Sequence, residues 1–318
     1  MLTFIVSAIR LGITFLFGST GEIITEKSGH LNLGIPGVMC IGAVCGCMGE
    51  SYYTSSLGKG EAINPFLAVF IPILASFVGS ALMGLLYSFL TVTLRANQNV
   101  TGLALTTFGI GLTNFMIARI DVVSYSKASK YFTGLFTFSN KLGAVGKLLF
   151  SYGPMVYLAV IVAIAASYVL TKTRTGLSLR AVGESPATAD AVGISVTKYR
   201  YLATCIGCGI AGLGGLSYIM DYLNGNWEYS IDAMGWLSIA LVIFTVWRPN
   251  LSILGSFLFG GLYIAYNYIT GITFGEKELL KMLPYVVTIL VLVITSIRDK
   301  KENNPPAGLG VNYYREER

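Results

Sequence analysis

The chain has 318 residues, of which 54% are hydrophobic and only 12% are charged, whereas an ordinary soluble domain has about 25% charged residues. The deficit of charge extends along nearly the whole chain, so it excludes a soluble domain with one membrane anchor and indicates a polytopic membrane protein. The net charge of +6 does not indicate nucleic-acid binding, because the basic residues stand at the ends of apolar runs rather than in one patch.

Nine apolar runs have lengths suited to crossing a bilayer, whose core of about 30 Å needs roughly 20 residues per helix. They predict an all-α transmembrane bundle of about nine spans, within a range of eight to ten. The first run is expected to remain as a span, since no small-residue cleavage site and soluble domain follow it. The expected spans are Leu2–Phe17, Leu33–Met48, Phe66–Leu94, Val100–Ala118, Gly153–Leu170, Tyr201–Tyr222, Ala233–Trp247, Leu251–Thr270 and Leu280–Ile297.

Two of these runs are expected to be irregular. Phe66–Leu94 is too long for one untilted crossing, so it is expected to be tilted or broken near Gly79 and Gly84. The second run contains Gly34 and Pro36, which free backbone groups that must be bonded inside the protein, and this predicts a discontinuous helix.

The distribution of Lys and Arg predicts the orientation of the bundle. Alternating spans bring one set of basic residues to the same side, which is therefore expected to be cytoplasmic together with the C-terminus. The segment Arg119–Tyr152 carries basic residues on the opposite side and is expected to include a helix lying on the surface. The predicted cytoplasmic set is Lys27, Arg95, Lys172, Arg174, Arg180, Lys198, Arg200, Arg248, Arg298, Lys300 and Lys301.

Several motifs are expected to be structural rather than chemical. The stretch "GCGIAG" (207–212) fits a dinucleotide-binding pattern but lies inside an apolar run without a preceding strand. No GxxxxGK[ST] stretch occurs, so any ATP dependence must come from a partner. The five cysteines lie in apolar segments, where small-residue packing is a better account than a metal or redox site. Small residues at helical spacing, such as Gly42 with Gly46 and Ala211 with Gly215, favour close helix packing.

Two isolated polar residues have open interpretations. His30 is the only histidine, and it is expected to be interfacial rather than a catalytic base. Arg10 lies within the first span, where a buried charge commonly marks function. Snorkelling of Arg10, or its pairing with another helix, explains it equally well.

The polar stretch Arg174–Ser195 separates two apolar runs. Arg180–Gly183 is expected to form a turn. Ser185 as N-cap, Pro186 at the first helical position and Gly193 as terminator predict a short helix over 186–192. On that helix Ala187, Ala191 and Ile194 are expected to share one side, which leaves Glu184, Thr188 and Asp190 more exposed.

Four stretches in chain order resemble the permease subunits of ABC importers, in the branch for nucleosides, simple sugars and branched-chain amino acids. "TRTGLSLRAVGESPATADAVGISVTKYR" (173–200) resembles the cytoplasmic coupling segment of that branch, and "GEIITEKSGHLNLGIPGVMCIGA" (21–43) resembles its second-helix motif. "NQNVTGLALTTFGIGL" (97–112) fits the middle, and "GWLSIALVIFTVWRPNLSILGSFLFGG" (235–261) is similar to the late-helix signature. Within the branch the chain most resembles nucleoside-type permeases.

The resemblance implies a subunit of an ATP-driven importer in the plasma membrane of a prokaryote. The expected partners are two ABC ATPase subunits, a second permease subunit that is a distinct and longer paralogue, and an extracellular lipoprotein receptor. No cofactor is implied in this chain, because the partner ATPase binds the ATP, and no enzymatic activity is implied either. One permease domain is expected over 1–300, with a coupling segment over 171–200 and a cytoplasmic tail over 301–318.

The resemblance also implies site residues. Those expected to couple to the ATPase are Arg174, Gly176, Arg180, Gly183, Glu184, Ala187, Asp190 and Gly193. Those expected along the substrate pathway are Asn32, Gly34, Pro36, Asn99 and Thr101, although the polar ones serve equally well as helix caps or bundle hydrogen bonds. The chain departs from the family at Pro36, where an acidic residue is common, and at His30, where a small apolar residue is usual.

The solute stays open among nucleosides, free bases and ribose-like simple sugars. An ion-coupled secondary transporter is a weaker alternative, because apart from Arg10 charged residues are scarce in the expected spans. A membrane enzyme is weaker still, since no nucleophile, base and orienting group can be assembled from the polar residues.

Overall fold

The computed structural model describes residues 2–57, 61–133, 143–269, 271, 273–298 and 304–314. Every regular element among these residues is a helix, which confirms the predicted all-α class. Six helices are long and apolar enough to cross a membrane: α1 (Leu2–Glu26), α2 (Ile35–Ser56), α3 (Pro65–Ser88) with its π-helical end η1 (Phe89–Thr93), α4 (Gln98–Ile117), α8 (Pro154–Lys172) and α11 (Val196–Ser217) with its π-helical end η3 (Tyr218–Tyr222).

The other three expected spans contain shorter helices, so each predicted run forms a helix. These are α12 (Ile231–Phe244), α13 (Pro249–Ile264) with the 3-10 turn η4 (Ala265–Tyr268), and α15 (Leu283–Arg298). The connections contain α5 (Val122–Ser126), α6 (Ser129–Phe132), α7 (Gly143–Phe150), α9 (Arg174–Glu184), α10 (Pro186–Ala191) and α14 (Phe274–Lys281). Three of these, α5 to α7, lie in the segment Arg119–Tyr152, where a short helix was expected.

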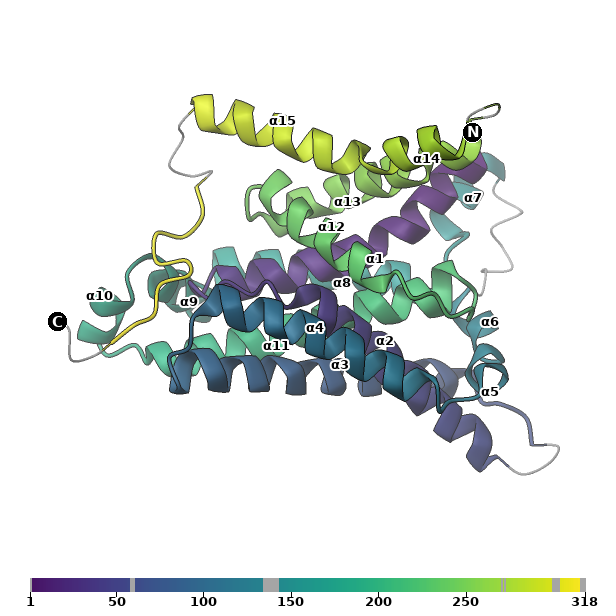
Figure 1. The fold of residues 1–318 in the computed structure, drawn as a ribbon, viewed down its shortest axis with the longest axis horizontal. Coiled ribbons are helices and arrows are strands. Elements are labelled where there is room, and N and C mark those ends of the chain that lie inside the picture. Colours follow the sequence, from purple (N-terminus) through teal and green to yellow (C-terminus); the bar gives the residue numbers. More distant parts are fainter. Residues whose placement is uncertain are drawn as a thin grey trace.

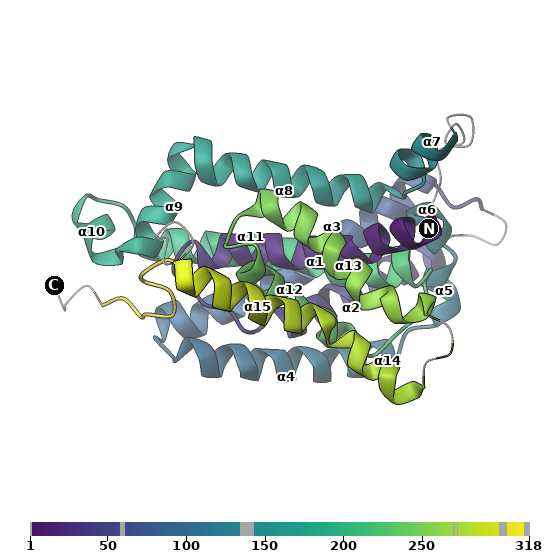
Figure 2. The same cartoon turned by 90° about the horizontal axis from the view of Figure 1, so that it is seen from above.

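The long helices run along the long axis of the molecule (Figures 1 and 2). One end carries α9, α10 and residues 304–314, and we call it the α10 end. The other end carries the N-terminus, α5, α6, α7 and α14, and we call it the α5 end. The described members of the predicted cytoplasmic set lie at the α10 end, where long helices end or begin, or within α9. The side chain of Arg298, together with Lys300 and Lys301, lies outside the described residues.

Helix α11 lies at the centre of the bundle and packs against α1, α2 and α3. Its small residues make this possible: a Cβ atom at Gly212 would overlap the Ser80 side chain, and one at Gly42 would overlap the backbone of Gly212. Because lipid is as apolar as the helix surfaces, such close backbone approach is a main source of packing energy in a membrane bundle. The "GCGIAG" stretch lies within α11, as expected of a structural motif.

The structure corrects both expectations about irregular helices. Helix α3 is not broken at Gly79 or Gly84, which leaves a tilt as the other alternative for this long run. A Cβ atom at Gly84 would lie 2.8 Å from the Thr204 carbonyl oxygen, so this glycine permits close packing on α11. Helix α2 is also continuous, because Pro36 falls in its first turn, where the missing N–H costs nothing. The irregular backbone lies instead in the preceding residues 27–34.

Arg10 is paired with another helix. This is one of the structural explanations offered above for a charge within the first span. Its guanidinium lies 2.9 Å from a carboxylate oxygen of Asp221, which is fully buried in η3. This pair joins the first helix to the end of α11. Breaking a buried pair by removing one partner leaves an uncompensated charge, so both residues are needed together.

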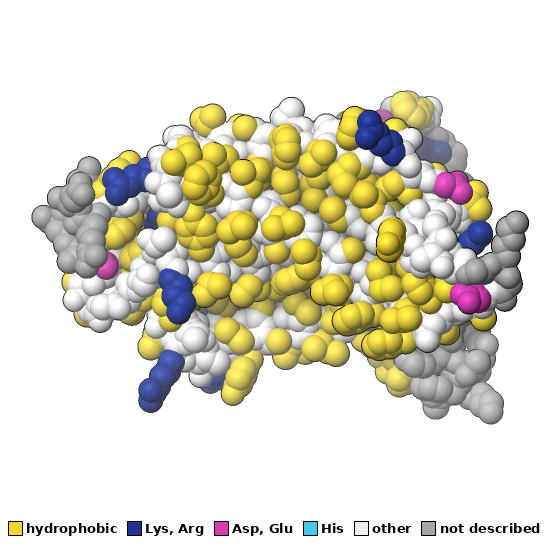
Figure 3. Space-filling model, turned by 90° about the horizontal axis from the view of Figure 1, so that it is seen from below, with side chains coloured by type: hydrophobic (Ala, Val, Ile, Leu, Met, Phe, Trp, Pro, Cys, Tyr) yellow, Lys and Arg dark blue, Asp and Glu magenta, His cyan; other side chains and the backbone are white. Residues whose placement is uncertain are grey.

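The outer surface over α3 is apolar, as expected of a face in contact with lipid. Hydrophobic side chains form a broad band across this face, while charged side chains lie toward the two ends (Figure 3). The exposed apolar residues of α3 are Phe66, Leu67, Phe70, Leu74, Val78, Leu82, Leu85 and Leu86.

Replacing Gly212 with Val is expected to destabilise the bundle by about 1–3 kcal/mol, because the added carbons overlap Ser80. The measurement is the melting temperature of the purified protein in detergent. Gly111→Ala on α4 is the matched control: nothing lies within 4 Å of a Cβ atom there. Equal melting temperatures for the two variants would contradict the central packing role of α11.

Candidate functional site

The coupling segment is two helices rather than a turn and one helix. Arg180–Gly183 lies within the last turns of α9, so the prediction of a turn there is wrong. Thr173 caps the start of α9 by accepting a hydrogen bond of 3.1 Å from the Gly176 backbone N–H. The helix continues to Glu184 because the first residue that prevents it is Pro186, which also holds Ser185 in an extended conformation.

Helix α10 begins and ends as its local sequence predicts. Ser185 accepts a hydrogen bond of 3.4 Å from the Thr188 backbone N–H, and Pro186 occupies the first turn. Gly193 follows with φ of +87°, and the Ile194 N–H bonds back to the Ala189 carbonyl oxygen at 2.9 Å. This is the glycine-terminated ending expected of a short helix.

The expected orientation of α10 is wrong. Ala189 is the buried residue, 2% exposed and packed with Val182 and Val196, because the preceding helix α9 turns that side of α10 inward. Ala187 and Ala191 are exposed, and the adjacent Val192 is 71% exposed. The exposed surface of α10 and the residue after it therefore includes three apolar side chains beside Thr188, and we call them the α10 patch (Ala187, Ala191 and Val192).

Helix α9 lies close to the rest of the bundle at its two glycines. A Cβ atom at Gly176 would overlap the Val169 carbonyl oxygen of α8, and one at Gly183 would overlap the Lys27 carbonyl oxygen. Arg174 is exposed, whereas Arg180 is half-buried in a cavity shared with Lys27, Glu184 and Arg248. Burial lowers the pKa of Lys27, although the nearby Glu184 opposes this shift.

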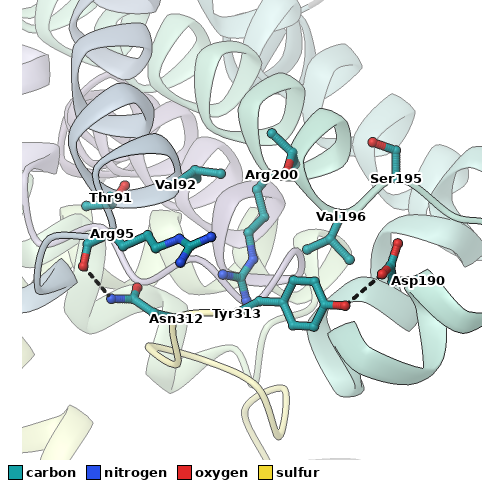
Figure 4. A pocket seen from close by; sticks show the side chains of 10 residues that line it. Thr91, Val92, Arg95, Asp190, Ser195, Val196, Arg200, Asn312 and Tyr313 are labelled. Atoms are coloured by element: carbon teal, nitrogen blue, oxygen red, sulfur yellow. Dashed lines mark hydrogen bonds between the residues drawn. The ribbon is translucent and has the colours of Figure 1, made fainter. Parts of the chain in front are cut away.

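Residues 304–314 lie against the coupling segment. The Gly308 N–H donates to the Gly183 carbonyl oxygen at 2.9 Å, and the Ala307 N–H donates to the Glu184 carboxylate at 3.3 Å. The Tyr313 hydroxyl donates to the Asp190 carboxylate at 2.7 Å (Figure 4). Glu184 and Asp190, expected to face a partner, thus bond to this chain's own C-terminal segment.

The same C-terminal segment also bonds to the transmembrane helices. Arg200 donates to the Val311 carbonyl oxygen at 3.0 Å, and the Gly310 N–H donates to the Gly29 carbonyl oxygen at 3.2 Å. The Asn312 side chain donates to the Arg95 carbonyl oxygen at 2.9 Å. Residues 304–314 therefore join α9 and α10 to α3, α11 and the connection between α1 and α2.

That connection, residues 27–34, is buried although it is not helical, and we call it the buried turn. The Asn32 N–H donates to Glu22 at 3.2 Å, and the Asn32 side chain accepts from the Gly34 N–H at 2.9 Å while donating to the Cys208 sulfur at 3.4 Å. Asn32 has no exposed surface. In this structure it holds the turn rather than facing an open pathway.

His30 is fully buried in the turn, so its expected interfacial position is wrong. Its Nε2 lies 2.7 Å from the Thr91 hydroxyl and its Nδ1 lies 2.8 Å from the Thr204 hydroxyl. Because Thr91 donates its own hydrogen to the Tyr87 carbonyl oxygen, Nε2 carries the ring proton and Nδ1 accepts from Thr204. Burial lowers the pKa of His30 to about 3, and the positive charge of Arg200 acts in the same direction.

The remaining expected pathway residues do not form one polar site. Asn99 is exposed at the start of α4, and the Thr101 hydroxyl bonds back to the Asn97 carbonyl oxygen at 2.8 Å. Gly34 and Pro36 are buried, and Pro36 packs directly against Gly235 of α12. The neighbouring Gln98 is the inward-facing side chain, and it accepts from the Leu31 N–H at 2.8 Å.

Sequence reasoning missed several buried carboxylates, because the expected spans ended too early. Glu22 and Glu26 lie in the last turns of α1, and Glu50 lies in α2; all three are buried. Glu26 accepts a hydrogen bond from the Trp247 indole N–H. The statement that charges are scarce in the spans is therefore wrong. Extending the first expected helix past Phe17 along the same helical pattern would have placed Glu22 and Glu26 inside it.

Comparison with known proteins identifies what this arrangement is. A family profile described as the branched-chain amino acid transport system / permease component matches residues 4–292, nearly the whole chain. This chain belongs to that permease family.

Several relatives are named as ABC transporter permeases. The nucleoside ABC transporter permease protein NupC of Lactococcus lactis is 33% identical over 287 residues, covering 88% of this chain and 87% of the relative. The guanosine ABC transporter permease protein NupQ of Bacillus subtilis is 31% identical over 286 residues, covering 86% of this chain and 85% of its own. A Haloferax volcanii protein provisionally named as a glucose ABC transporter permease is 29% identical over 342 residues. The match covers 98% of this chain and 97% of the relative.

This permease is thus the membrane-embedded subunit of an ABC transporter and resides in the plasma membrane. Its relatives confirm the resemblance on which the sequence interpretation was based, including the likeness to nucleoside permeases. The candidate coupling residues of the permease lie together at the α10 end, whereas its candidate pathway residues are divided between the buried turn and the surface.

Protonation of His30 in the unfolded protein is expected to lower stability at acid pH. The pKa of His30 is about 6.5 in the unfolded protein and about 3 in the folded protein. Its effect on the free energy of unfolding is therefore fully favourable above about pH 6.5. The free energy of unfolding decreases as the pH falls toward 3, by about 2 kcal/mol at pH 5. His30→Gln keeps one donor and one acceptor but does not titrate. The fall in melting temperature between pH 7.5 and pH 5 should be smaller for this variant, and an equal fall would contradict the buried neutral imidazole.

Proposed function

We propose that this permease imports nucleosides and is driven by separate ATPase subunits that dock on its α10 end. The observation that carries the proposal is the similarity of nearly the whole chain to two permeases named for nucleoside and guanosine transport. In this proposal a lipoprotein receptor delivers the solute on the α5 side, and a second, longer permease subunit completes the pathway. ATP is bound only by the ATPases, and this chain carries no cofactor.

The α10 end is proposed to be cytoplasmic. Lys27, Arg95, Arg174 and Arg248 gather there, and basic residues favour the cytoplasmic side of short connections. The C-terminal residues 304–314 then lie in the cytoplasm with α9 and α10, as part of a tail that continues past the permease domain.

The α10 patch is proposed as the contact with the ATPase. Ala187, Ala191 and the 71% exposed Val192 form a small apolar surface that no other described residue covers. The capped ends of α10 and its bonds to the C-terminal segment fix its orientation. Motion of the ATPase can then be transmitted to the bundle only if the patch binds more tightly in one state than in the other.

Val192→Asp is expected to weaken ATPase association at least about tenfold, because an unpaired charge would be buried in the contact. The measurement is the amount of ATPase that co-purifies with the permease. Val123→Asp is the matched control, since Val123 is 59% exposed and lies on α5 at the opposite end. Loss of association in both variants, or in neither, would contradict the assignment of the α10 patch.

Competition for uptake tests the solute. In cells with the complete system, an unlabelled nucleoside at about ten times its KM should lower uptake of labelled guanosine about tenfold, whereas ribose and glucose should not. Competition by a sugar instead would favour the second candidate, a simple-sugar permease, which the Haloferax relative supports. Uptake without any ATPase subunit would contradict both and favour ion coupling.

A further inference from the structure

A small cavity lies at the α10 end between the end of α3, the start of α11 and the C-terminal segment (Figure 4). Its volume is about 190 Å³, more than ten times the about 10–15 Å³ that one water needs. Most of its lining side chains are polar or charged, among them Thr91, Arg95, Asp190, Ser195, Arg200 and Tyr313.

Arg200 is the unusual member of this lining. Its side chain is only 2% exposed, yet among the described residues no carboxylate forms an ion pair with it. One terminal nitrogen donates to the Val311 carbonyl oxygen, and the buried Nε has no partner there. A guanidinium has five N–H donors, and burying its charge is costly unless an anion and hydrogen bonds compensate it.

Arg95 brings a second positive charge to the same cavity. It lies in the turn between α3 and α4 with φ of +60°, a conformation that is uncommon for residues other than glycine. Strained backbone of this kind persists where surrounding structure imposes it, often at binding sites. Figure 4 shows the side chains of Arg95 and Arg200 extending into the same space. The Arg95 guanidinium also lies over the Tyr314 ring, 4.8 Å from its centroid, so the C-terminal segment holds it at this position.

The rest of the lining also favours an anion. Its described side chains include two guanidinium groups and one carboxylate, that of Asp190, so the charge of the lining is positive even though the carboxylate opposes an anion. Ser195 caps α11, a helix of 22 residues, and Ser195, Val196 and Thr197 line the cavity, so the positive end of the helix dipole lies beside it. Ser195 adds a hydroxyl group, whose hydrogen is available to donate because its oxygen accepts from the Lys198 N–H.

We propose that this cavity is a binding site for a phosphate-class oxyanion, held between Arg95 and Arg200. Guanidinium groups match the geometry of phosphate oxygens, which accept paired hydrogen bonds from them. Arg200 also bonds to Val311, and Asn312 bonds to the Arg95 carbonyl oxygen, so the bound anion fixes the C-terminal segment against α3 and α11. The site is independent of which solute the permease transports.

Binding of inorganic phosphate to the full-length permease in phosphatidylcholine nanodiscs tests the site. Phosphate should raise the melting temperature in a saturable way relative to chloride at equal ionic strength, and it should slow hydrogen exchange of residues 304–314. Arg95→Gln and Arg200→Gln should each weaken the affinity at least about tenfold. Arg174→Gln is the matched control, because Arg174 is exposed at the same end and does not line the cavity.

Nanodiscs containing phosphatidylglycerol distinguish a lipid headgroup from free phosphate. A stabilisation that appears only with this lipid and is lost in Arg95→Gln supports the same site with a headgroup as its ligand. Arg95 is exposed, so its replacement is not expected to prevent folding even if that of Arg200 does. The proposal is overturned if neither phosphate nor phosphatidylglycerol stabilises the protein, or if Arg95→Gln responds as the unaltered protein does.

Discussion

The structure depends on one constraint: the buried turn, residues 27–34, is not helical, so its backbone groups must be bonded by other parts of the protein. Gln98 accepts from the Leu31 N–H, Tyr87 donates to the Leu31 carbonyl oxygen, and Glu22 accepts from the Asn32 N–H. These partners come from α4, α3 and α1. The turn therefore fixes the positions of three helices at the α10 end.

The coupling segment is attached to the bundle through this turn. Gly183 of α9 lies against the Lys27 carbonyl oxygen, and the C-terminal segment bonds to both Gly183 and Gly29. His30 then connects the turn to Thr204 of α11, the central helix. Hydrogen bonds and direct backbone packing therefore form a continuous chain of contacts from α9 and the C-terminal segment to the middle of the bundle.

Local signals in the sequence predicted part of the local structure. Each apolar run contains a helix, and Ser185, Pro186 and Gly193 mark the ends of α10, whereas the turn expected at Arg180–Gly183 is helical and the number of membrane spans stays a prediction. Features that depend on distant residues were not predictable in the same way. The side of α10 that is buried is set by α9 and the C-terminal segment, and the burial of His30 is set by Thr91 and Thr204. No periodicity or spacing carries that information.

The irregular and charged features collect at the α10 end, and this distribution has a physical reason. Three of the four described non-glycine residues with positive φ, namely Arg95, Val246 and Trp247, lie in turns at this end. In the lipid-facing middle such a conformation would leave backbone groups without partners, whereas at the end they bond to neighbouring segments and to water. The middle of the bundle is therefore regular and packed on α11, while most of the irregular backbone lies at the α10 end, where neighbouring segments bond to it.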